Sequence, residues 1–278
     1  MIPYFIVPPL RVGPLTLQPF GVLAAAGILL AGRIAQRESQ RRGRPVAPLA
    51  RFLGWAVAGG IFGGHLVHLF LYHPEELRTS WGTWQILKVW DGLSSTGGVL
   101  GGVVAAAIFF PVVGARFGDY ADALALGIAP GWAVARLGCF TVHDHPGVLT
   151  DFFLAVDFPA GARHDLGLYD ALVLFAFAGV LRAVSRRGAL RDRLLPLLAL
   201  LYGTSRFLLD FLRARDLAYV DARHFGLTAA QYAALLLVVY GLHNLARSAP
   251  MGGSCPRSLV APPAANHSST PDESQSTV

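Results

Sequence analysis

The chain of 278 residues is 54% hydrophobic and only 14% charged, and its mean hydropathy is +0.49. These values exclude an ordinary soluble domain and are typical of a protein that crosses the membrane several times. The net charge of +6 does not indicate nucleic-acid binding, because the basic residues cluster in short segments between long apolar runs, as they do in cytoplasmic loops.

The chain begins with a segment, residues 1–17, that is rich in proline and apolar side chains and carries Arg11 as its only charge. We interpret it as an irregular or interfacial lead-in. It lacks the positively charged start of a secretory signal, and the apolar run from Phe20 to Ala31 continues into an arginine-rich segment rather than a cleavage site. We therefore expect this run to be a retained first membrane span.

Including this first run, the chain has seven apolar windows. Each is close to the ~20 residues that an α-helix needs to cross a bilayer. They predict an all-α, polytopic integral membrane protein with about seven transmembrane helices in a single domain, residues 1–247. The expected spans are residues 18–36, 52–72, 95–114, 120–139, 166–184, 194–212 and 228–245.

Basic residues are distributed unevenly between the two sets of connecting segments. Fourteen fall on the side that holds the first, third and fifth loops and the C-terminus, whereas seven fall on the other side. Because cytoplasmic loops carry the excess of positive charge, this predicts an N-terminus outside and a C-terminus in the cytoplasm. Cys139 and Cys255 then lie on opposite sides of the membrane, so we expect no disulfide bond between them.

Two glycine-rich stretches lie in the second and third spans, at residues 59–64 (GGIFGG) and 96–102 (TGGVLGG). Glycines four positions apart let helix backbones approach closely, which predicts tight packing of these two helices. From Ser248 onward the chain turns to Ser, Pro, Gly, Asn and Thr, which bury too little apolar surface to drive folding. We expect residues 248–278 to be a disordered cytoplasmic tail.

Arg136 is the first candidate functional residue. An arginine inside a membrane span costs about 2.5–3.5 kcal/mol on insertion scales, so it is usually kept for a polar partner or a ligand. Arg136 has no acidic residue three or four positions away in the sequence. A phosphate or carboxylate on a ligand is therefore the expected partner, because guanidinium binds such oxygens bidentately.

Other unusual polar residues gather at the same predicted depth, near the outer face of the membrane. Arg206 and Asp210 lie four positions apart, on one face of the sixth span. A site in the outer leaflet, reachable by lipid and by exported protein, explains this distribution. The other residues predicted to lie near this outer face are Thr96, Gly97, Gly98, His143, Asp144, His145, His164, Asp165, Tyr169 and Asp170.

Several of these polar residues also have simpler interpretations. Arg206 and Asp210 can form an ion pair that neutralises its own charge, with no ligand involved. His65 and His68, on the second span, are more typical of interfacial or core side chains than of ligands.

Two other kinds of site were considered. His143, Asp144, His145 and His164 include residue types that bind zinc, but their spacing matches no helical zinc motif, so we expect no metal. The stretch from Gly92 to Ser95 partly resembles the GxS turn of serine hydrolases. A serine nucleophile needs a nearby histidine, and no spacing in the sequence places one beside these serines.

Four segments occur in the order and spacing of one known family. The segments are residues 88–102 (KVWDGLSSTGGVLGG), 135–144 (ARLGCFTVHD), 163–170 (RHDLGLYD) and 203–213 (GTSRFLLDFLR). Over about residues 10–245, the sequence resembles the prolipoprotein diacylglyceryl transferases of the bacterial inner membrane. That family also has seven spans with the N-terminus outside.

The resemblance implies transfer of a diacylglyceryl group from phosphatidylglycerol to the lipobox cysteine thiol of an exported prolipoprotein, with release of glycerol phosphate. It implies no metal and no other cofactor. The expected partners are phosphatidylglycerol, prolipoproteins and the membrane, and no nucleic acid.

The resemblance also assigns residues to the site by position. Arg136 and Arg206 match the essential arginines that face the lipid headgroup. The implied substrate-binding positions are these two arginines with Thr96, Gly97, Gly98, Asp144, Tyr169, Asp170 and Asp210. This chain departs from the family at Thr96, which stands where the family has histidine, at Cys139, where it has asparagine, and at Asp144 and Asp210, where it has glutamate.

The proton acceptor of such a reaction must differ from the family's, because Thr96 does not titrate near neutral pH. Histidine does, with an ordinary pKa of about 6.5. We therefore predict a base among the outer histidines, preferring His143, then His164, then His145, with Asp144 or Asp165 orienting the ring. The alternative is a divergent, non-catalytic member of the family that binds phospholipid or lipoprotein without transferring a lipid group.

Overall fold

The computed structural model of the chain describes residues 1–13, 15–78, 82–89, 92–217 and 223–247. Residues Met1–Arg247 form one compact unit. The tail expected to be disordered, residues 248–278, lies outside the described residues together with Cys255, so the predictions about the tail and its cysteine stay predictions.

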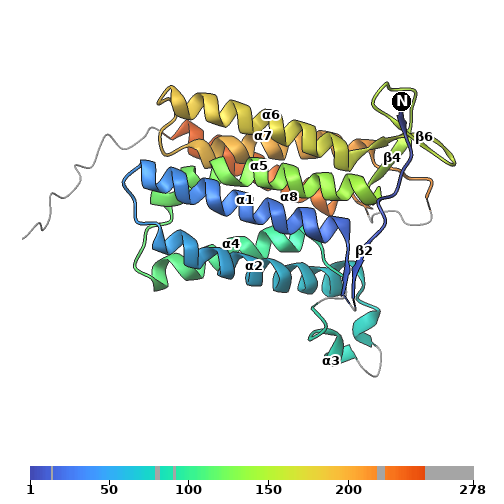
Figure 1. Cartoon of the computed structure of the whole chain (residues 1–278), viewed down its shortest axis with the longest axis horizontal. Coiled ribbons are helices and arrows are strands. Elements are labelled where there is room, and N and C mark those ends of the chain that lie inside the picture. The colour runs from blue at the N-terminus through green and yellow to red at the C-terminus, as the bar shows by residue number, and fades with distance from the viewer. Residues whose placement is uncertain (14, 79–81, 90–91, 218–222, 248–278) are drawn as a thin grey trace, which may run out of the picture. The chain divides into compact units, whose positions relative to one another are not determined.

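Long α-helices make up most of the described chain and run side by side in a bundle (Figure 1). The seven expected spans coincide with helices to within five residues at each end. Their bounds are α1 Pro19–Arg41, α2 Ala47–Val67, α4 Ser95–Val112, α5 Gly118–Val142, α6 Leu166–Arg186, α7 Leu194–Leu209 and α8 Ala229–Ala246. Shorter pieces are a π-helix at His68–Tyr72, 3₁₀ helices at Glu76–Arg78 and Asp210–Leu212, and α3 at Gly82–Gln85.

Six helices in the described part of the chain are long and apolar enough to cross a membrane: α1, α2 with its π-helical continuation, α5, α6, α7 with its 3₁₀ continuation, and α8. The remaining apolar helix, α4, has 18 residues and extends about 27 Å, close to the ~30 Å of a bilayer's hydrocarbon core. The prediction of a polytopic, mostly helical membrane protein is confirmed. A seventh crossing and the outward direction of the N-terminus stay predictions.

The all-α expectation did not include the short strands, which gather with the N-terminus at one end of the bundle (Figure 1). Each has only two to five residues, too few for an alternating pattern to stand out in the sequence. The strands are β1 Ile2–Pro3, β2 Leu10–Val12, β3 Leu15–Leu17, β4 Pro146–Leu149, β5 Val156–Phe158, β6 Gly161–Asp165, β7 Arg223–His224 and β8 Leu227–Thr228.

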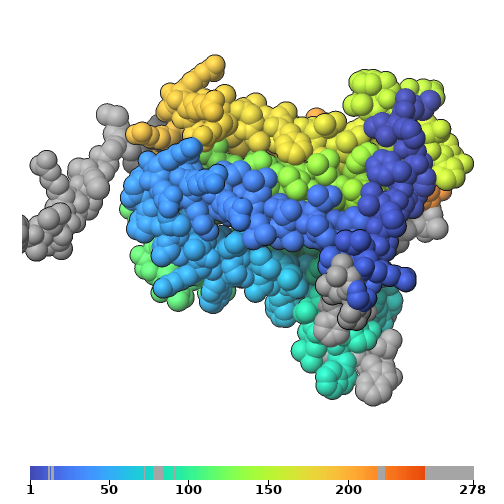
Figure 2. All heavy atoms as spheres, in the orientation of Figure 1, coloured from blue at the N-terminus to red at the C-terminus, as the bar shows by residue number. Residues whose placement is uncertain are grey.

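The strands join the N-terminal lead-in to the segment between α5 and α6. One sheet has the order β1-β5-β6-β4, in which β1 is parallel to β5 and the other neighbours are antiparallel. The pairs β2–β3 and β7–β8 are separate hairpins. Figure 2 shows the N-terminal segment, in dark blue, along this end of the bundle and beside the yellow-green residues of the α5–α6 segment.

Small residues bring two pairs of helices into backbone contact. Between α1 and α5, a methyl group on Gly27 would lie 2.2 Å from the carbonyl oxygen of Gly131. Between α2 and α4, a methyl group on Gly101 would lie 1.9 Å from the carbonyl oxygen of Gly59. Both distances are shorter than any carbon–oxygen contact, so only glycine fits. The predicted tight packing of the second and third spans is confirmed.

Replacing Gly101 with alanine is therefore expected to destabilise the protein by about 1–3 kcal/mol or more, the usual penalty of overpacking, because the methyl group pushes α2 away from α4. Gly102→Ala is the matched control on the same helix, since nothing lies within 4 Å of that added methyl group. Thermal unfolding in detergent measures both variants. Equal melting temperatures would show that the two helices are not held this closely.

At the end of the bundle away from the strands, one buried carboxylate ties α5 to its neighbours. Asp122 accepts hydrogen bonds from Arg42 Nη1 at 2.9 Å and from the backbone N–H groups of Asp192 and Leu194 at 2.8 Å each. These contacts connect α5 with the end of α1 and the start of α7. They hold α5 and α7 side by side, and these are the two helices that carry Arg136 and Arg206.

Candidate functional site

The centre of the candidate site is the carboxylate of Asp170, in the second turn of α6. Its Oδ2 lies 3.2 Å from Arg136 Nε, on α5, and 3.0 Å from Arg206 Nη1, on α7. All three side chains are buried. The two arginines singled out from the sequence thus meet at one carboxylate, and Asp170 supplies the acidic partner that Arg136 lacks on its own helix.

A second carboxylate extends the network toward α8. Asp210 Oδ1 accepts a hydrogen bond from Arg206 Nη2 at 2.9 Å and lies 3.0 Å from Arg213 Nε. Its Oδ2 accepts a hydrogen bond from the hydroxyl of Thr228. Thr228 is also the N-cap of α8, in a capping box with Gln231, so the start of α8 is held at the carboxylate of Asp210.

The network concentrates charge in a largely buried region. Three guanidinium groups and two carboxylates, Asp170 and Asp210, lie within ion-pair distance of one another. Asp170 Oδ1 has no hydrogen-bond partner among the described residues. Because the guanidinium groups of Arg136 and Arg206 are held in place by a shared carboxylate, they have the chemistry to donate hydrogen bonds to phosphate or carboxylate oxygens.

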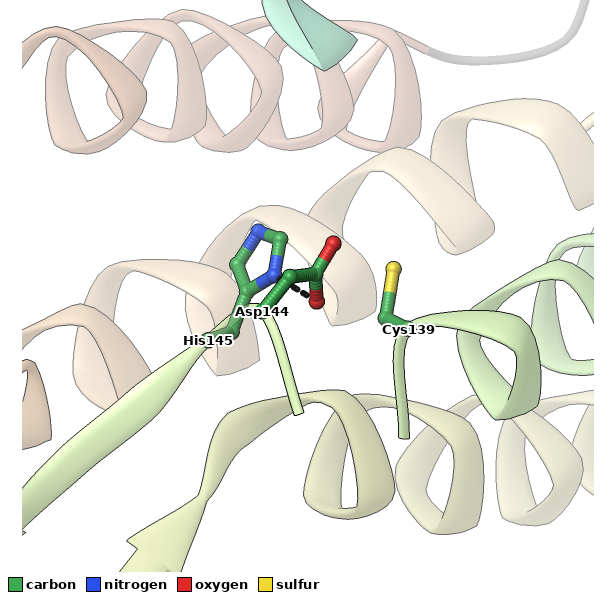
Figure 3. A group of neighbouring side chains, drawn as sticks. All are labelled: Cys139, Asp144 and His145. Carbon is green, nitrogen blue, oxygen red and sulfur yellow. Dashed lines mark hydrogen bonds and ion pairs between the residues drawn. The ribbon is translucent and has the colours of Figure 1, made fainter. Parts of the chain in front are cut away.

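A second polar cluster lies beside Arg136 and consists of Cys139, Asp144 and His145 (Figure 3). One ligand-type atom from each residue lies within 4.8 Å of the other two. In Figure 3 the Asp144 carboxylate lies between the ring of His145, whose Nδ1 it hydrogen-bonds, and the sulfur of Cys139. Arg136 Nη1 donates a hydrogen bond to Cys139 Sγ at 3.6 Å, which joins this cluster to the arginine network.

His143, the preferred histidine from the sequence, lies in an apolar setting. It takes a left-handed conformation (φ 50°) directly after α5 and is buried. Its Nδ1 lies 2.6 Å from Asp165 Oδ2, and its Nε2 is buried with no hydrogen-bond partner among the described residues. Its ring contacts the aromatic rings of Tyr4, Phe5, Phe140 and Phe158.

Asp165, the partner of His143, has two roles. Its Oδ1 accepts the backbone N–H of Leu168 at 3.0 Å and so caps the start of α6. Burial raises the pKa of Asp165, and the hydrogen bond with His143 opposes that rise. The pair therefore links the end of α5 to the start of α6 and orients the ring of His143.

His164 and Tyr169 lie together, as their positions in the same motif suggested. His164 Nδ1 is 2.9 Å from the hydroxyl oxygen of Tyr169, and burial lowers the pKa of His164. Since His143 pairs with Asp165 and His164 pairs with Tyr169, the four residues weighed as a zinc site do not converge. Within the described ranges, the group with metal-ligand atoms is Cys139, Asp144 and His145 instead.

The positions carried over to α4 lie in a helix contact. Gly97 faces α2, where a methyl group on it would lie 2.3 Å from the carbonyl oxygen of Gly63. Thr96 and Gly98 are half-buried on the same first turn. The hydroxyl of Ser94 accepts the backbone N–H of Gly97 at 3.4 Å, so this serine of the GxS-like stretch serves as the N-cap of α4.

His65 agrees with its interpretation as a core residue. It is buried, and its ring nitrogens lie 3.2 Å from the carbonyl oxygen of Gly92 and 2.7 Å from that of Gln85. These contacts fix the segment that leads into α4.

Sequence reasoning missed several members of the network, including Tyr202, whose hydroxyl accepts a hydrogen bond from Arg136. Arg213 was counted only as a loop charge, although its spacing of three from Asp210 places both on one helical turn. Thr228 was not considered, although Thr228 and Gln231 have the spacing of a capping box. Cys139 was noted as a departure from the family and not as a neighbour of Arg136.

Comparison with known protein families matches residues 9–247 to the model of the family described as prolipoprotein diacylglyceryl transferase. Several curated relatives bear the name phosphatidylglycerol–prolipoprotein diacylglyceryl transferase. The one from Symbiobacterium thermophilum is 28% identical over 255 residues, which cover 85% of this chain and 90% of the relative. That from Tolumonas auensis is 30% identical, covering 76% and 83%, and that from Rhizobium leguminosarum bv. trifolii is 32% identical, covering 74% and 78%.

Proposed function

The chain belongs to the prolipoprotein diacylglyceryl transferase family, and on that basis we propose that it transfers a diacylglyceryl group from phosphatidylglycerol to the lipobox cysteine thiol of exported prolipoproteins. The names of its relatives state both the lipid and the protein substrate. Within the chain, the observation that carries the proposal is the buried arrangement of Arg136, Asp170 and Arg206.

The proposed location is the inner membrane of a bacterium, with the N-terminus and the strands on the outer side. Exported prolipoproteins reach that side, and the candidate site lies at the end of the bundle that carries the strands. The arginine-rich α1–α2 and α6–α7 loops lie at the other end, which suits the cytoplasmic face.

Phosphatidylglycerol fits the charge of the network. Its phosphodiester carries one negative charge, and Arg136 and Arg206 provide two guanidinium groups, held at Asp170, that can donate hydrogen bonds to phosphate oxygens. When the glyceryl carbon is attacked, further negative charge develops on the departing glycerol phosphate. Guanidinium groups held rigidly in a low-dielectric site stabilise that charge without reorganising.

The roles of the neighbouring residues follow from this chemistry. Asp170 holds both guanidinium groups at one point, and Asp210 holds Arg206 from the other side. Tyr169, Asp144, Thr96, Gly97 and Gly98 are proposed to line the lipid and acceptor positions. Their assignment rests on their positions in segments that resemble the family's motifs, although Thr96 and Asp144 differ from the family in residue type.

The experiment that tests the function is complementation of a bacterium depleted of its own transferase, with mass spectrometry of a reporter lipoprotein. Growth and a reporter that gains the mass of a diacylglyceryl group are expected. A protein that binds phosphatidylglycerol vesicles but never modifies the reporter would refute the transferase and establish the non-catalytic alternative.

Asp210→Asn is expected to weaken transfer without abolishing it. The change removes the charge that holds Arg206 and Arg213, but Arg206 keeps its contact with Asp170. A roughly 10-fold loss of rate is expected, which corresponds to ~1.4 kcal/mol in the activation free energy. Measured rates of lipid transfer to a lipobox peptide that are indifferent to the change would mean that this pair is structural only.

A further inference from the structure

We propose that the imidazole of His145, held by the carboxylate of Asp144, accepts the proton of the acceptor thiol in the proposed transfer reaction. This inference rests on the proposed function and concerns the histidine that the sequence ranked last of three. The three rings differ in where they lie relative to Arg136.

The two histidines preferred from the sequence are engaged elsewhere. The ring of His143 contacts four aromatic rings, and its Nε2, the nitrogen that does not contact Asp165, is buried. His164 shares its Nδ1 with the hydroxyl of Tyr169. Among the described contacts, neither ring meets a member of the arginine network.

His145 is placed beside that network by the backbone. Its carbonyl oxygen accepts the N–H of Leu166 at 3.1 Å, which ties it to the start of α6. The left-handed turn at His143 ends α5 and reverses the chain, so that Asp144 and His145 come back over Cys139. Because Cys139 contacts Arg136, the imidazole stands one side chain away from the proposed phosphate site.

The arrangement leaves His145 with a nitrogen suited to accept a proton. Asp144 accepts the hydrogen bond from Nδ1, so Nε2 carries the lone pair. The side chain of His145 is 19% exposed and that of Asp144 is 40% exposed, so this cluster is reachable in a way that the buried ring of His143 is not.

The charges around His145 suit the same role. The groups that face it are Asp144 from its own segment, Arg136 and Cys139 from α5, and Arg213 from the segment after α7. Burial lowers the pKa of His145, Asp144 opposes this effect, and the two arginines add to it. The ring is therefore neutral at pH 7 and able to take a proton, and Asp144 stabilises the imidazolium that results.

The step is balanced in atoms and charge. The S–H bond of the acceptor cysteine breaks as its proton moves to Nε2 of His145, and the sulfur attacks the glyceryl carbon that bears the phosphate oxygen. A carbon–sulfur bond forms, the carbon–oxygen bond breaks, and its electron pair leaves with glycerol phosphate. The imidazolium then returns its proton to the departing phosphate, which restores the neutral ring.

The test is the pH dependence of diacylglyceryl transfer from phosphatidylglycerol to a lipobox peptide by the purified full chain in detergent. The wild-type rate is expected to fall as pH drops through the lowered pKa of His145, below about 6.5. In His145→Gln, the rate at neutral pH is expected to fall by roughly 10²–10⁴-fold and the acid limb to disappear. The matched control is His224→Gln, an exposed histidine on β7.

Two further variants separate a proton acceptor from a structural residue. In Asp144→Asn the acid limb is expected to move to lower pH, because Asp144 raises the pKa of His145. In His145→Ala, added imidazole is expected to restore part of the rate. If His145→Gln fails to bind phosphatidylglycerol vesicles, its loss of rate does not identify the proton acceptor, and the pH profile of Asp144→Asn is used instead. An acid limb that stays at the wild-type pH in Asp144→Asn would overturn the proposal.

The remaining outcomes distinguish this inference from the proposed function. A wild-type protein that never transfers lipid refutes the function, and the inference with it. Transfer that is unchanged in His145→Gln refutes the inference alone. Loss of the acid limb in Cys139→Ala would show that His145 serves the thiol of Cys139 rather than the acceptor, which also overturns the proposal.

Discussion

Arg136→Ala is expected to reduce diacylglyceryl transfer by roughly 10²–10³-fold or more, the effect of removing one preorganised donor from developing negative charge. Binding of phosphatidylglycerol is expected to weaken in parallel, because the change removes one of two guanidinium groups held at Asp170. The fold is expected to survive, since Asp170 keeps its contact with Arg206 and no carboxylate is left unpaired.

Arg136→Lys separates the effect of the positive charge from that of the guanidinium shape. Lysine keeps the charge but is a point cation without the planar fork of guanidinium, so it is expected to restore vesicle binding more than transfer. Arg215→Ala, at an exposed arginine after α7, is the control for a general loss of positive charge. Phosphatidylglycerol binding that is unchanged in both Arg136→Ala and Arg206→Ala would exclude the network as the phosphate site.

Asp170→Asn is expected to have the largest effect on stability. It leaves two buried guanidinium groups without the carboxylate that they share, and breaking a buried ion pair in this way costs about 3–5 kcal/mol. Transfer is expected to be lost as well, because Arg136 and Arg206 are no longer held at one point. Melting temperature and folded yield in detergent measure the first effect, and the peptide assay measures the second.

Asp119→Asn provides the contrast for that measurement. Asp119 pairs with Arg44 at 3.0 Å, and because their side chains are 30% and 48% exposed, the pair is expected to contribute about 0–1 kcal/mol. The double variant Asp170→Asn with Arg206→Met leaves one guanidinium group, that of Arg136, without this carboxylate instead of two, and is expected to regain part of the stability but not transfer. A double variant that is less stable than Asp170→Asn would show that the packing of Arg206 outweighs its uncompensated charge.

The helices were predictable because their signal is local. Each apolar window reports directly on the ~20 residues that must face lipid, and the windows match α1, α2 and α4–α8 to within five residues. The strands were not predictable, because β4, β5 and β6 have three to five residues each and are defined by pairing with one another. The four-stranded sheet also depends on β1, about 150 residues away in the chain.

The candidate site could be predicted only in part, for a similar reason. The cost of burying arginine singled out Arg136. Its partner Asp170 lies on another helix, and the spacing of residues along one helix does not predict contacts between helices. Distance along the chain favoured His143 among the histidines, because it follows Arg136 by seven residues, and that ranking as proton acceptor stays a prediction. His143 itself has a left-handed backbone conformation. Its ring contacts aromatic rings, and the chain turns back after it so that His145 lies beside Cys139.

Arg136 and Asp170 belong to different spans, so neither charge has this partner when its own helix leaves the ribosome, whereas Arg206 already has Asp210 four residues on. Arg136 and Asp170 each add about 2.5–3.5 kcal/mol to the insertion of their helices as separate segments, and that cost is offset only when α5 and α6 dock. Biogenesis is therefore expected to be cooperative across these helices. The proposed lipid site then forms only in a chain whose assembly is complete, so an incompletely inserted protein is expected not to withdraw phosphatidylglycerol from the bilayer.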